Sequence, residues 1–219
     1  GLEKTGGTIV TCFNGEDMYK LGILKLDILG VAQLDVLAVG VTLVSERHGV
    51  DIDWNKIGLE DYKTYQMMSR GETTGIFQFE SLGIQKLCKQ VNPKTFEELN
   101  AVNALHRPGT LHSGMTSEYV DRRYGKKEWD PIHPLLEEIT GSTYGIVVYQ
   151  EQMLKMMRDL GDMEWSKVNV IRKIVKHSKG QEAFDRQRGF FRKGCKNHGL
   201  TVAQADKIFD RVIMFGSYS

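Results

Sequence analysis

The stretch that decides the fold is Q-E-A-F-D-R-Q-R-G-F-F-R-K-G-C-K-N, from Gln181 to Asn197. It has the periodicity of an amphipathic helix, and so do Ser166 to His177 before it and Thr201 to Phe215 after it. Thr201 and Gln204 have the form of a capping box, which predicts that the last helix begins there. We therefore expect the C-terminal part of the chain to be a group of helices.

Helical patterns continue toward the N-terminus. The stretch after Gly30 has apolar residues at three- and four-residue spacings, which predicts a helix with one buried side that ends near Gly49. Further helices are expected over residues 59–69, 81–91, 95–105, 118–124 and 134–139, and in a segment ending at 160. Short strands are expected at 21–29 and 74–80, and a strand or extended turn at 143–149. The predicted fold class is mainly α with a few short strands (α+β).

Composition limits the class of protein. The chain has 219 residues, of which 41% are hydrophobic and 26% charged, so it is globular and neither disordered nor fibrous. Its three cysteines form no C-x-x-C pair, which argues against a disulfide scaffold or zinc site and favours a reducing cytoplasm. Ile28 to Ser45 is interrupted by Asp35, and no export leader precedes it, so we expect no membrane partner.

Positive charge is concentrated late in the chain. Residues 152–199 hold 12 Lys and Arg against 5 Asp and Glu, although the whole chain has a net charge of only +1. Arg172, Lys176 and Lys179 follow a spacing of four then three, so they share one helix face, with Lys173 beside them. A polyphosphate ligand would explain these like charges, and a solvated surface is the alternative explanation.

An early charged pair suggests related chemistry. Lys25 and Asp27 lie two residues apart in an apolar run, and in an extended strand their side chains would share one face. Burying both charges costs free energy unless a ligand, metal or partner compensates. A site for Mg²⁺ and a triphosphate needs these types, because carboxylates bind the cation and lysine binds phosphate oxygens.

Several motifs, in order, resemble one family. They are L-K-L-D-I-L-G (24–30), G-E-T-T-G-I-F-Q-F-E-S (71–81), A-L-H-R-P-G (104–109), T-Y-G-I-V-V-Y-Q-E-Q (143–152), I-R-K (171–173) and the basic helix after residue 180. Together they make the chain similar to the alpha subunit of bacterial replicative DNA polymerase III, a C-family polymerase. The resemblance covers nearly the whole chain and is weakest up to about Lys20.

The resemblance implies roles for particular residues. Asp27 would be the third metal-binding carboxylate of the palm, and Lys25 the lysine beside it that faces the triphosphate. The nucleotide-binding residues would be Arg107, Arg172, Lys173, Lys176, Lys179 and Gln78. Residues 1–30 would derive from the palm, and residues 31–219 would form a helical fingers domain truncated at its C-terminus. Arg122, Arg123, Lys126 and Lys127 would contact DNA, or would form an ordinary exposed charge run.

The resemblance also implies cofactor and partners. Two Mg²⁺ ions would serve nucleotidyl transfer to template-primer DNA from a dNTP, together with the remainder of the polymerase chain and replisome subunits. The other two palm carboxylates are absent, and Asp51-Ile52-Asp53, which imitates that pair, comes after Asp27 and is expected to have a surface or capping role. We therefore expect no polymerase activity from this chain alone.

Two other classes of protein stay open at this point. The basic helices could instead dock an acidic partner in a non-catalytic interaction module. A metal hydrolase could use Asp27, Asp51, Asp53 and histidines, but the six histidines lack H-x-x-x-H spacing. No G-x-x-x-x-G-K-[ST] sequence is present, which argues against a P-loop NTPase.

Overall fold

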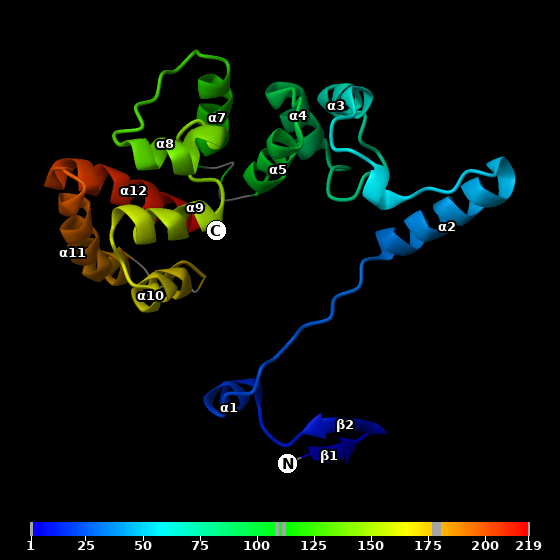
Figure 1. The fold of residues 1–219 in the computed structure, drawn as a ribbon, viewed down its shortest axis with the longest axis horizontal. Coiled ribbons are helices and arrows are strands. Elements are labelled where there is room, and N and C mark those ends of the chain that lie inside the picture. Colours follow the sequence, from blue (N-terminus) through cyan, green and yellow to red (C-terminus); the bar gives the residue numbers. More distant parts are fainter. Residues whose placement is uncertain (1, 108–109, 111–112, 177–180, 219) are drawn as a thin grey trace. The chain divides into compact units, whose positions relative to one another are not determined.

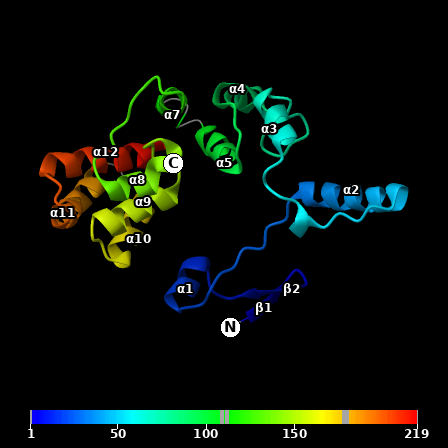
Figure 2. The ribbon, with the colours of Figure 1, turned by 45° about the horizontal axis from the view of Figure 1, so that its top comes forward.

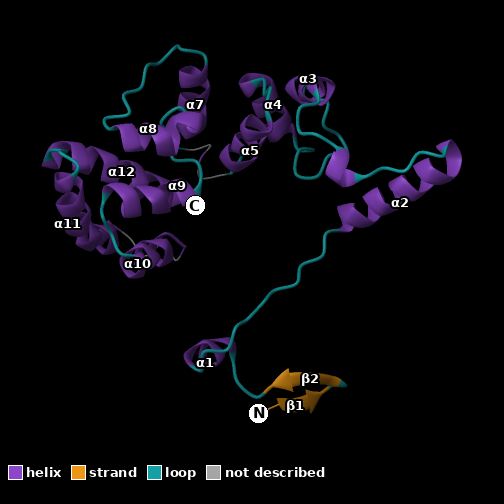
Figure 3. Cartoon of the chain, in the orientation of Figure 1, coloured by secondary structure: helices purple, strands orange, loops and turns teal. Residues whose placement is uncertain are grey.

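The computed structural model describes residues 2–107, 110, 113–176 and 181–218, with positions 175, 176, 181, 183, 217 and 218 described as backbone only (Figure 1). The chain forms two compact units, residues 1–56 and residues 57–219. Helices make up most of the described chain, and the strands are confined to one small hairpin (Figure 3). The predicted fold class, mainly α with a few short strands, is confirmed.

The first unit begins with a β-hairpin. Strands β1 (Leu2–Thr5) and β2 (Thr8–Thr11) pair antiparallel, with Leu2 opposite Thr11 and Thr5 opposite Thr8. Gly6 and Gly7 form the two-residue connection, and both have positive φ angles, which glycine adopts without steric cost. Helix α1 (Gly15–Lys20) follows and is capped by the side chain of Asn14.

Helix α2 (Ala32–His48) matches the helix predicted after Gly30, and it ends at Gly49 in the left-handed conformation. A short 3₁₀ turn, η1 (Trp54–Lys56), follows. The strand predicted over 21–29 is wrong, because residues 23–31 belong to no helix or strand. A strand needs a neighbouring strand for its hydrogen bonds, and β1 and β2 are paired only with each other.

The apolar side chains of the first unit are not covered. None of its described residues is buried, and Leu26 and Ile28 are 77% and 97% exposed. The buried side predicted for α2 is therefore also not found, since Leu34 and Leu37 are 63% and 48% exposed. The helix forms from its local sequence without the packing partner that the pattern predicts.

The second unit begins with helices α3 (Tyr62–Ser69), α4 (Leu82–Val91), α5 (Phe96–Leu105) and α7 (Met115–Arg123). Ser81 and Thr95 cap α4 and α5 through their side chains, as the sequence predicts. The apolar faces of α4, α5 and α7 meet in one core, which includes Ile84, Leu87, Val91, Val102, Leu105 and Tyr119. This core fixes the position of α5, on which the candidate site is built.

The strand predicted over 74–80 is also wrong. The segment forms turns, with Gly75 and Gln78 at φ angles of 82° and 63°. The Glu80 carboxylate accepts a hydrogen bond from the Gly75 N–H, and the Thr73 hydroxyl donates to the Phe79 carbonyl. These local bonds satisfy backbone groups inside the loop, so the alternating pattern does not produce a strand.

A second core occupies the C-terminal part. Helix α8 (Pro134–Thr140) and the 3₁₀ turn η2 (Gly141–Thr143) lead to an extended turn and α9 (Gln150–Lys155), which continues as a π-helix, η3 (Met156–Leu160). Helices α10 (Trp165–Lys176), α11 (Gln181–Asn197) and α12 (Val202–Tyr218) complete a bundle with them (Figure 2). Met153, Met156 and Met157 are fully buried there with Phe191 and Phe209.

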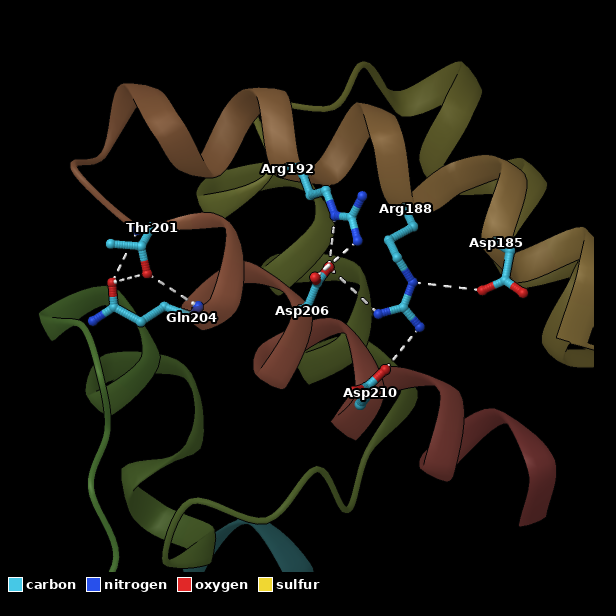
Figure 4. Close-up of polar contacts among 7 residues, drawn as sticks. All are labelled: Asp185, Arg188, Arg192, Thr201, Gln204, Asp206 and Asp210. Carbon is cyan, nitrogen blue, oxygen red and sulfur yellow. Dashed lines mark hydrogen bonds and ion pairs between the residues drawn. The ribbon is translucent and has the colours of Figure 1, made fainter.

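Charged residues fasten α11 to α12 (Figure 4). Arg188 of α11 pairs with Asp210 at 2.7 Å, and Arg192 binds both carboxylate oxygens of Asp206, at 2.7 and 2.8 Å. The predicted capping box is confirmed, because Thr201 N–H donates to Gln204 Oε1 and Gln204 N–H donates to Thr201 Oγ1. The capping box therefore fixes the start of α12, and the ion pairs join α12 to α11.

The cysteines are free thiols, with Cys12 exposed and Cys88 and Cys195 buried. Burial raises the pKa of Cys88 to about 11 and that of Cys195 to about 12, so both thiols stay protonated at neutral pH. Among the described residues, no helix has both the length and the apolar content needed to cross a membrane.

Candidate functional site

A groove of about 380 Å³, which we call the α5 cleft, lies between α5 and the turn around η2. It is lined by Glu97, Asn100, Asn103, Ala104, Arg107, Ser142, Thr143 and Tyr149. The lining offers two amides, hydroxyl groups, one exposed guanidinium, one aromatic ring and the carboxylate of Glu97. These groups match a ligand that combines a planar ring, sugar hydroxyls and phosphate, because amides and hydroxyls bond polar edges and the guanidinium binds phosphate.

Two residues predicted from the sequence meet at this cleft. Arg107 lines it directly, and Gln78 accepts a hydrogen bond from the Asn103 side chain at 3.0 Å. Gln78 reaches Asn103 from a left-handed backbone conformation, which is uncommon for a residue with a Cβ atom. Asn100 and Asn103, which lie three residues apart on α5, were not predicted. Arg107 follows four residues after Asn103, beyond the end of α5.

One buried side chain holds the far wall of the cleft. Gln152 Oε1 accepts from the N–H groups of Val148 and Tyr149 at 2.8 and 3.0 Å. Its Nε2 donates to the Ile139 carbonyl and to Thr143 Oγ1, at 3.1 and 2.8 Å. The end of α8, the turn and the start of α9 are thus joined by one amide, which fixes Tyr149 at the cleft.

The turn itself explains a motif glycine. Gly145 has a φ angle of 76° and is buried, and a Cβ atom there would collide with the Trp129 ring. Only glycine fits both the backbone conformation and the space. This residue of T-Y-G-I-V-V-Y-Q-E-Q is therefore explained by structure, without a contact to a ligand.

Helix α10 presents part of the predicted basic face. Val168, Ile171 and Ile174 are buried in the core, while Arg172 and Lys173 are exposed. Neither of these two cations has an ion pair in the part of the chain that the structure describes. Lys176 is the last residue of α10 and is described as backbone only, and Lys179 lies outside the described residues. Arg172 and Lys173 are therefore accessible to phosphate oxygens.

Lys25 and Asp27 form an ion pair at 2.8 Å, with 58% and 63% of their side-chain surfaces exposed. The hydrogen bond that Lys25 donates to Asp27, together with the negative charge of that carboxylate, raises the pKa of Lys25. The ion pair brings the two side chains together, although the strand on which they were predicted to share a face is absent. They belong to residues 1–56, whereas Arg107 and Arg172 belong to residues 57–219, so a site shared by all four stays a prediction.

The described residues do not form a Mg²⁺ site by themselves. No group of three or more His, Cys, Asp or Glu side chains suited to a metal ion occurs among them. Asp27 offers one carboxylate, already paired with Lys25, whereas Mg²⁺ requires octahedral coordination by oxygen atoms. The expected surface and capping roles of the imitation pair are confirmed, because Asp51 accepts from Ser45 and Asp53 from the Asn55 N–H.

Comparison with known proteins places this arrangement in a family. Residues 33–199 match the family described as the finger domain of the bacterial DNA polymerase III alpha subunit. The chain belongs to this family. It is 34% identical over 220 residues to DNA polymerase III subunit alpha of Saccharopolyspora erythraea, covering 99% of this chain and 18% of that protein.

Other relatives named DNA polymerase III subunit alpha give the same result. The Aquifex aeolicus protein is 35% identical over 213 residues, covering 97% of this chain and 18% of the relative. The Pseudomonas aeruginosa protein is 34% identical over 227 residues, covering 99% and 19%. The chain thus spans about a fifth of the length of the relatives it matches. The matched finger domain contains the α5 cleft and α10.

Four further cations, Arg122, Arg123, Lys126 and Lys127, are predicted from the sequence to contact DNA. Arg123 pairs with Glu98 at 2.6 Å, and these two side chains are only 10% and 15% exposed. Arg122 pairs with Glu118 and is 13% exposed. Lys127 pairs with Glu118 at 3.0 Å and is 56% exposed, and Lys126 is exposed. Arg123 joins α7 to α5, and Arg122 also donates to the Tyr144 carbonyl at 2.9 Å, which leaves the two lysines at the surface.

Proposed function

We propose that this chain is the fingers part of a replicative DNA-directed DNA polymerase, and that it binds the triphosphate of the incoming dNTP and the template-primer DNA. The match of residues 33–199 to the finger domain carries this proposal. Exposed Arg172 and Lys173 on α10 support it, because cations without protein partners can stabilise the charge of phosphate groups.

The α5 cleft has a place in this proposal. Arg107 would bind phosphate, Gln78 would act through Asn103, and Tyr149 would offer a ring face to a base or sugar. Lys176 and Lys179 belong to the same proposed basic face by their position in the sequence. On the DNA side we propose backbone contacts for Lys126 and Lys127 only, since Arg122 and Arg123 are mostly covered.

Mg²⁺ binding is expected of the full-length polymerase. Asp27 would supply one ligand, and carboxylates outside this sequence would supply the others. The remainder of the polymerase chain, the replisome subunits and a cytoplasmic location belong to the same expectation. The palm and fingers assignment, residues 1–30 and 31–219, is likewise proposed.

Titration with a dNTP tests the proposal. Replacing Arg172 and Lys173 together by Gln should weaken dNTP binding by the 219-residue chain about tenfold or more at low salt, because each charge-assisted contact contributes about 1.5 to 3 kcal/mol. The matched control is Arg186→Gln, an exposed arginine of α11 paired with Glu182. Equal affinity of the double variant and the control would refute the phosphate role of α10.

A primer-extension assay tests the expected inactivity. The chain alone should not extend a primer, since only one of the implied metal carboxylates is present. Extension by purified chain that disappears in Asp27→Asn would show that the site is complete without other segments.

A further inference from the structure

A second hollow lies between α7 and α12, and we call it the α7–α12 pocket. It has a volume of about 290 Å³. Its lining residues are Met115, Glu118, Arg122, Gly145, Ile146, Val147, Lys207, Asp210, Arg211 and Met214. None of these residues lines the α5 cleft or belongs to α10, so the pocket is not part of the proposed polymerase site.

Arg211 gives this pocket its unusual charge. Its side chain is half-buried, and the described part of the chain offers it no hydrogen bond or ion pair. Burial lowers the pKa of Arg211 and the nearby positive charge of Arg122 lowers it further, whereas the negative charges of Asp130 and Glu118 raise it. A guanidinium stays charged in proteins, so this half-buried cation has carboxylates nearby but no bonded counter-ion among the described residues.

The two carboxylates that line the pocket are already engaged. Glu118 is shared between Arg122 and Lys127, and Asp210 pairs with Arg188. Arg122 also donates to the Tyr144 carbonyl at 2.9 Å, so its guanidinium is held by the protein. Lys207 lies exposed four residues before Arg211 on the same face of α12, also without a described ion pair. Lys207 and Arg211 are therefore the lining cations that a ligand can reach.

The rest of the lining is apolar. Met115, Ile146 and Val147 are buried side chains, and the volume falls near the lower end of the range for small-ligand sites. The pocket therefore suits a small molecule with an anionic end and a compact body. Two cations without a described ion pair, Lys207 and Arg211, match a dianion better than a single carboxylate.

We propose that the α7–α12 pocket binds a dianionic phosphate group, either free or as a phosphomonoester, through Lys207 and Arg211. Guanidinium groups bind phosphate oxygens with paired N–H donors, and lysine adds a mobile point charge. A phosphomonoester carries a charge of about −1.5 to −2 at pH 7, which would compensate the positive charges of Lys207 and Arg211. This inference goes beyond the proposed polymerase function and does not depend on it.

The test uses the 219-residue chain with Arg107→Gln, Arg172→Gln and Lys173→Gln, so that the phosphate contacts proposed in the α5 cleft and on α10 do not contribute. The probes are dTMP, thymidine and inorganic phosphate, titrated at low salt and followed by NMR signals of the 145–147 amides and of arginine Nε. We expect dTMP to shift these signals and thymidine to leave them unchanged. Arg211→Gln should weaken dTMP binding about tenfold, as expected for one lost charge-assisted contact.

Controls keep the result interpretable. Arg70→Gln removes an equal charge from an exposed pair with Glu72 and should leave the affinity for dTMP unchanged. If Arg211→Gln unfolds the chain, exposed Lys207→Gln gives a second measurement, with an expected loss of about threefold.

The outcomes separate the sources of phosphate. Tighter binding of dTMP than of inorganic phosphate supports an organic monoester, and equal binding supports a free phosphate ion. The proposal is overturned if thymidine binds as well as dTMP, if folded Arg211→Gln or Lys207→Gln keeps full affinity, or if neither phosphate probe binds at millimolar concentration. Failure here would leave the dNTP titration on α10 unaffected, so the two proposals can fail separately.

Discussion

Gln152 uses its whole hydrogen-bonding capacity inside the protein, with two bonds accepted and two donated. Gln152→Leu would keep much of the volume but leave buried N–H and carbonyl groups without partners. We expect the free energy of unfolding to fall by about 3 kcal/mol, because each buried unpaired group costs about 1 to 3 kcal/mol. Chemical denaturation measures this loss.

Gln150, two residues earlier in the same motif, is the matched control. Its side chain is exposed, so Gln150→Leu should change the free energy of unfolding by no more than about 0.5 kcal/mol. Equal effects of the two substitutions would mean that the Gln152 network does not stabilise the fold.

Two glycines of α11 provide a second pair. A Cβ atom at Gly194 would collide with the Gly161 carbonyl. A Cβ atom at Gly189 would have no atom of another element within 4 Å. Gly194→Ala should lower the free energy of unfolding by about 2 kcal/mol or more, and Gly189→Ala should raise it by about 0.5 to 1 kcal/mol. Thermal unfolding of both variants would show shifts of opposite sign if this packing is correct.

The nucleotide-binding roles of Arg107 and Gln78 stay predictions. Both come from recognisable motifs; Arg107 lines the α5 cleft, and Gln78 bonds to Asn103, which lines it. Asn100 and Asn103 were missed because isolated amides are common on helix surfaces, although their spacing of three places both on one face of α5. Gln152 was part of a quoted motif, but its role depends on backbone groups of three elements that no local pattern identifies.

At the scale of elements, the α11–α12 ion pairs should make stability depend on pH. The hydrogen bond from Arg192 is the main cause that lowers the pKa of Asp206 in the folded protein. An unfolded aspartate has a pKa of about 3.9, so the pair stabilises above that pH and its contribution is lost as pH falls through the lower folded value.

Asp206→Asn should therefore lower the free energy of unfolding by about 1 kcal/mol at pH 7 and have a smaller effect near pH 2. Denaturation across this range measures the difference between variant and parent. Glu138→Gln, which changes an exposed carboxylate of α8 without a described ion pair, should give the same small effect at each pH. An Asp206→Asn effect that is constant from pH 7 to pH 2 would contradict the assignment.

Helices were predictable from sequence and strands were not. Periodicity, Ser81, Thr95 and the Thr201–Gln204 box identify helices whose ends depend on local bonds. The strands expected at 21–29 and 74–80 are absent, because a strand requires a partner that alternation in one segment cannot supply. The hairpin of β1 and β2 instead forms around Gly6-Gly7, where the partner is adjacent in the chain.

At the scale of the molecule, both cores lie in residues 57–219. A shortened chain of residues 57–219 should therefore fold by itself, with an unfolding midpoint within about 2 °C of that of the 219-residue chain. Circular dichroism with thermal unfolding measures this. A much lower midpoint would show that residues 1–56 stabilise the cores, which their exposed side chains do not suggest.

A convergence of Asp27 with the basic helix stays a prediction. Motif order links both to one polymerase family, but the two residues lie in different units of the chain. Their placement depends on interactions between units, and these leave no periodic pattern within either segment. The family match at 33–199 supports the finger domain and begins after Asp27.

The solvent-exposed leucines and isoleucines of residues 23–31, together with the exposed apolar side chains of α2, have a practical consequence for crystallography. Water leaves such surfaces readily, at a gain of roughly 25 cal/mol for each Å² removed from solvent. In a concentrated drop, two copies could adhere through these side chains, and the resulting lattice would display a symmetric dimer. Such a dimer would result from the exposed apolar side chains of one segment, and should not be taken for the assembly that functions in the cell.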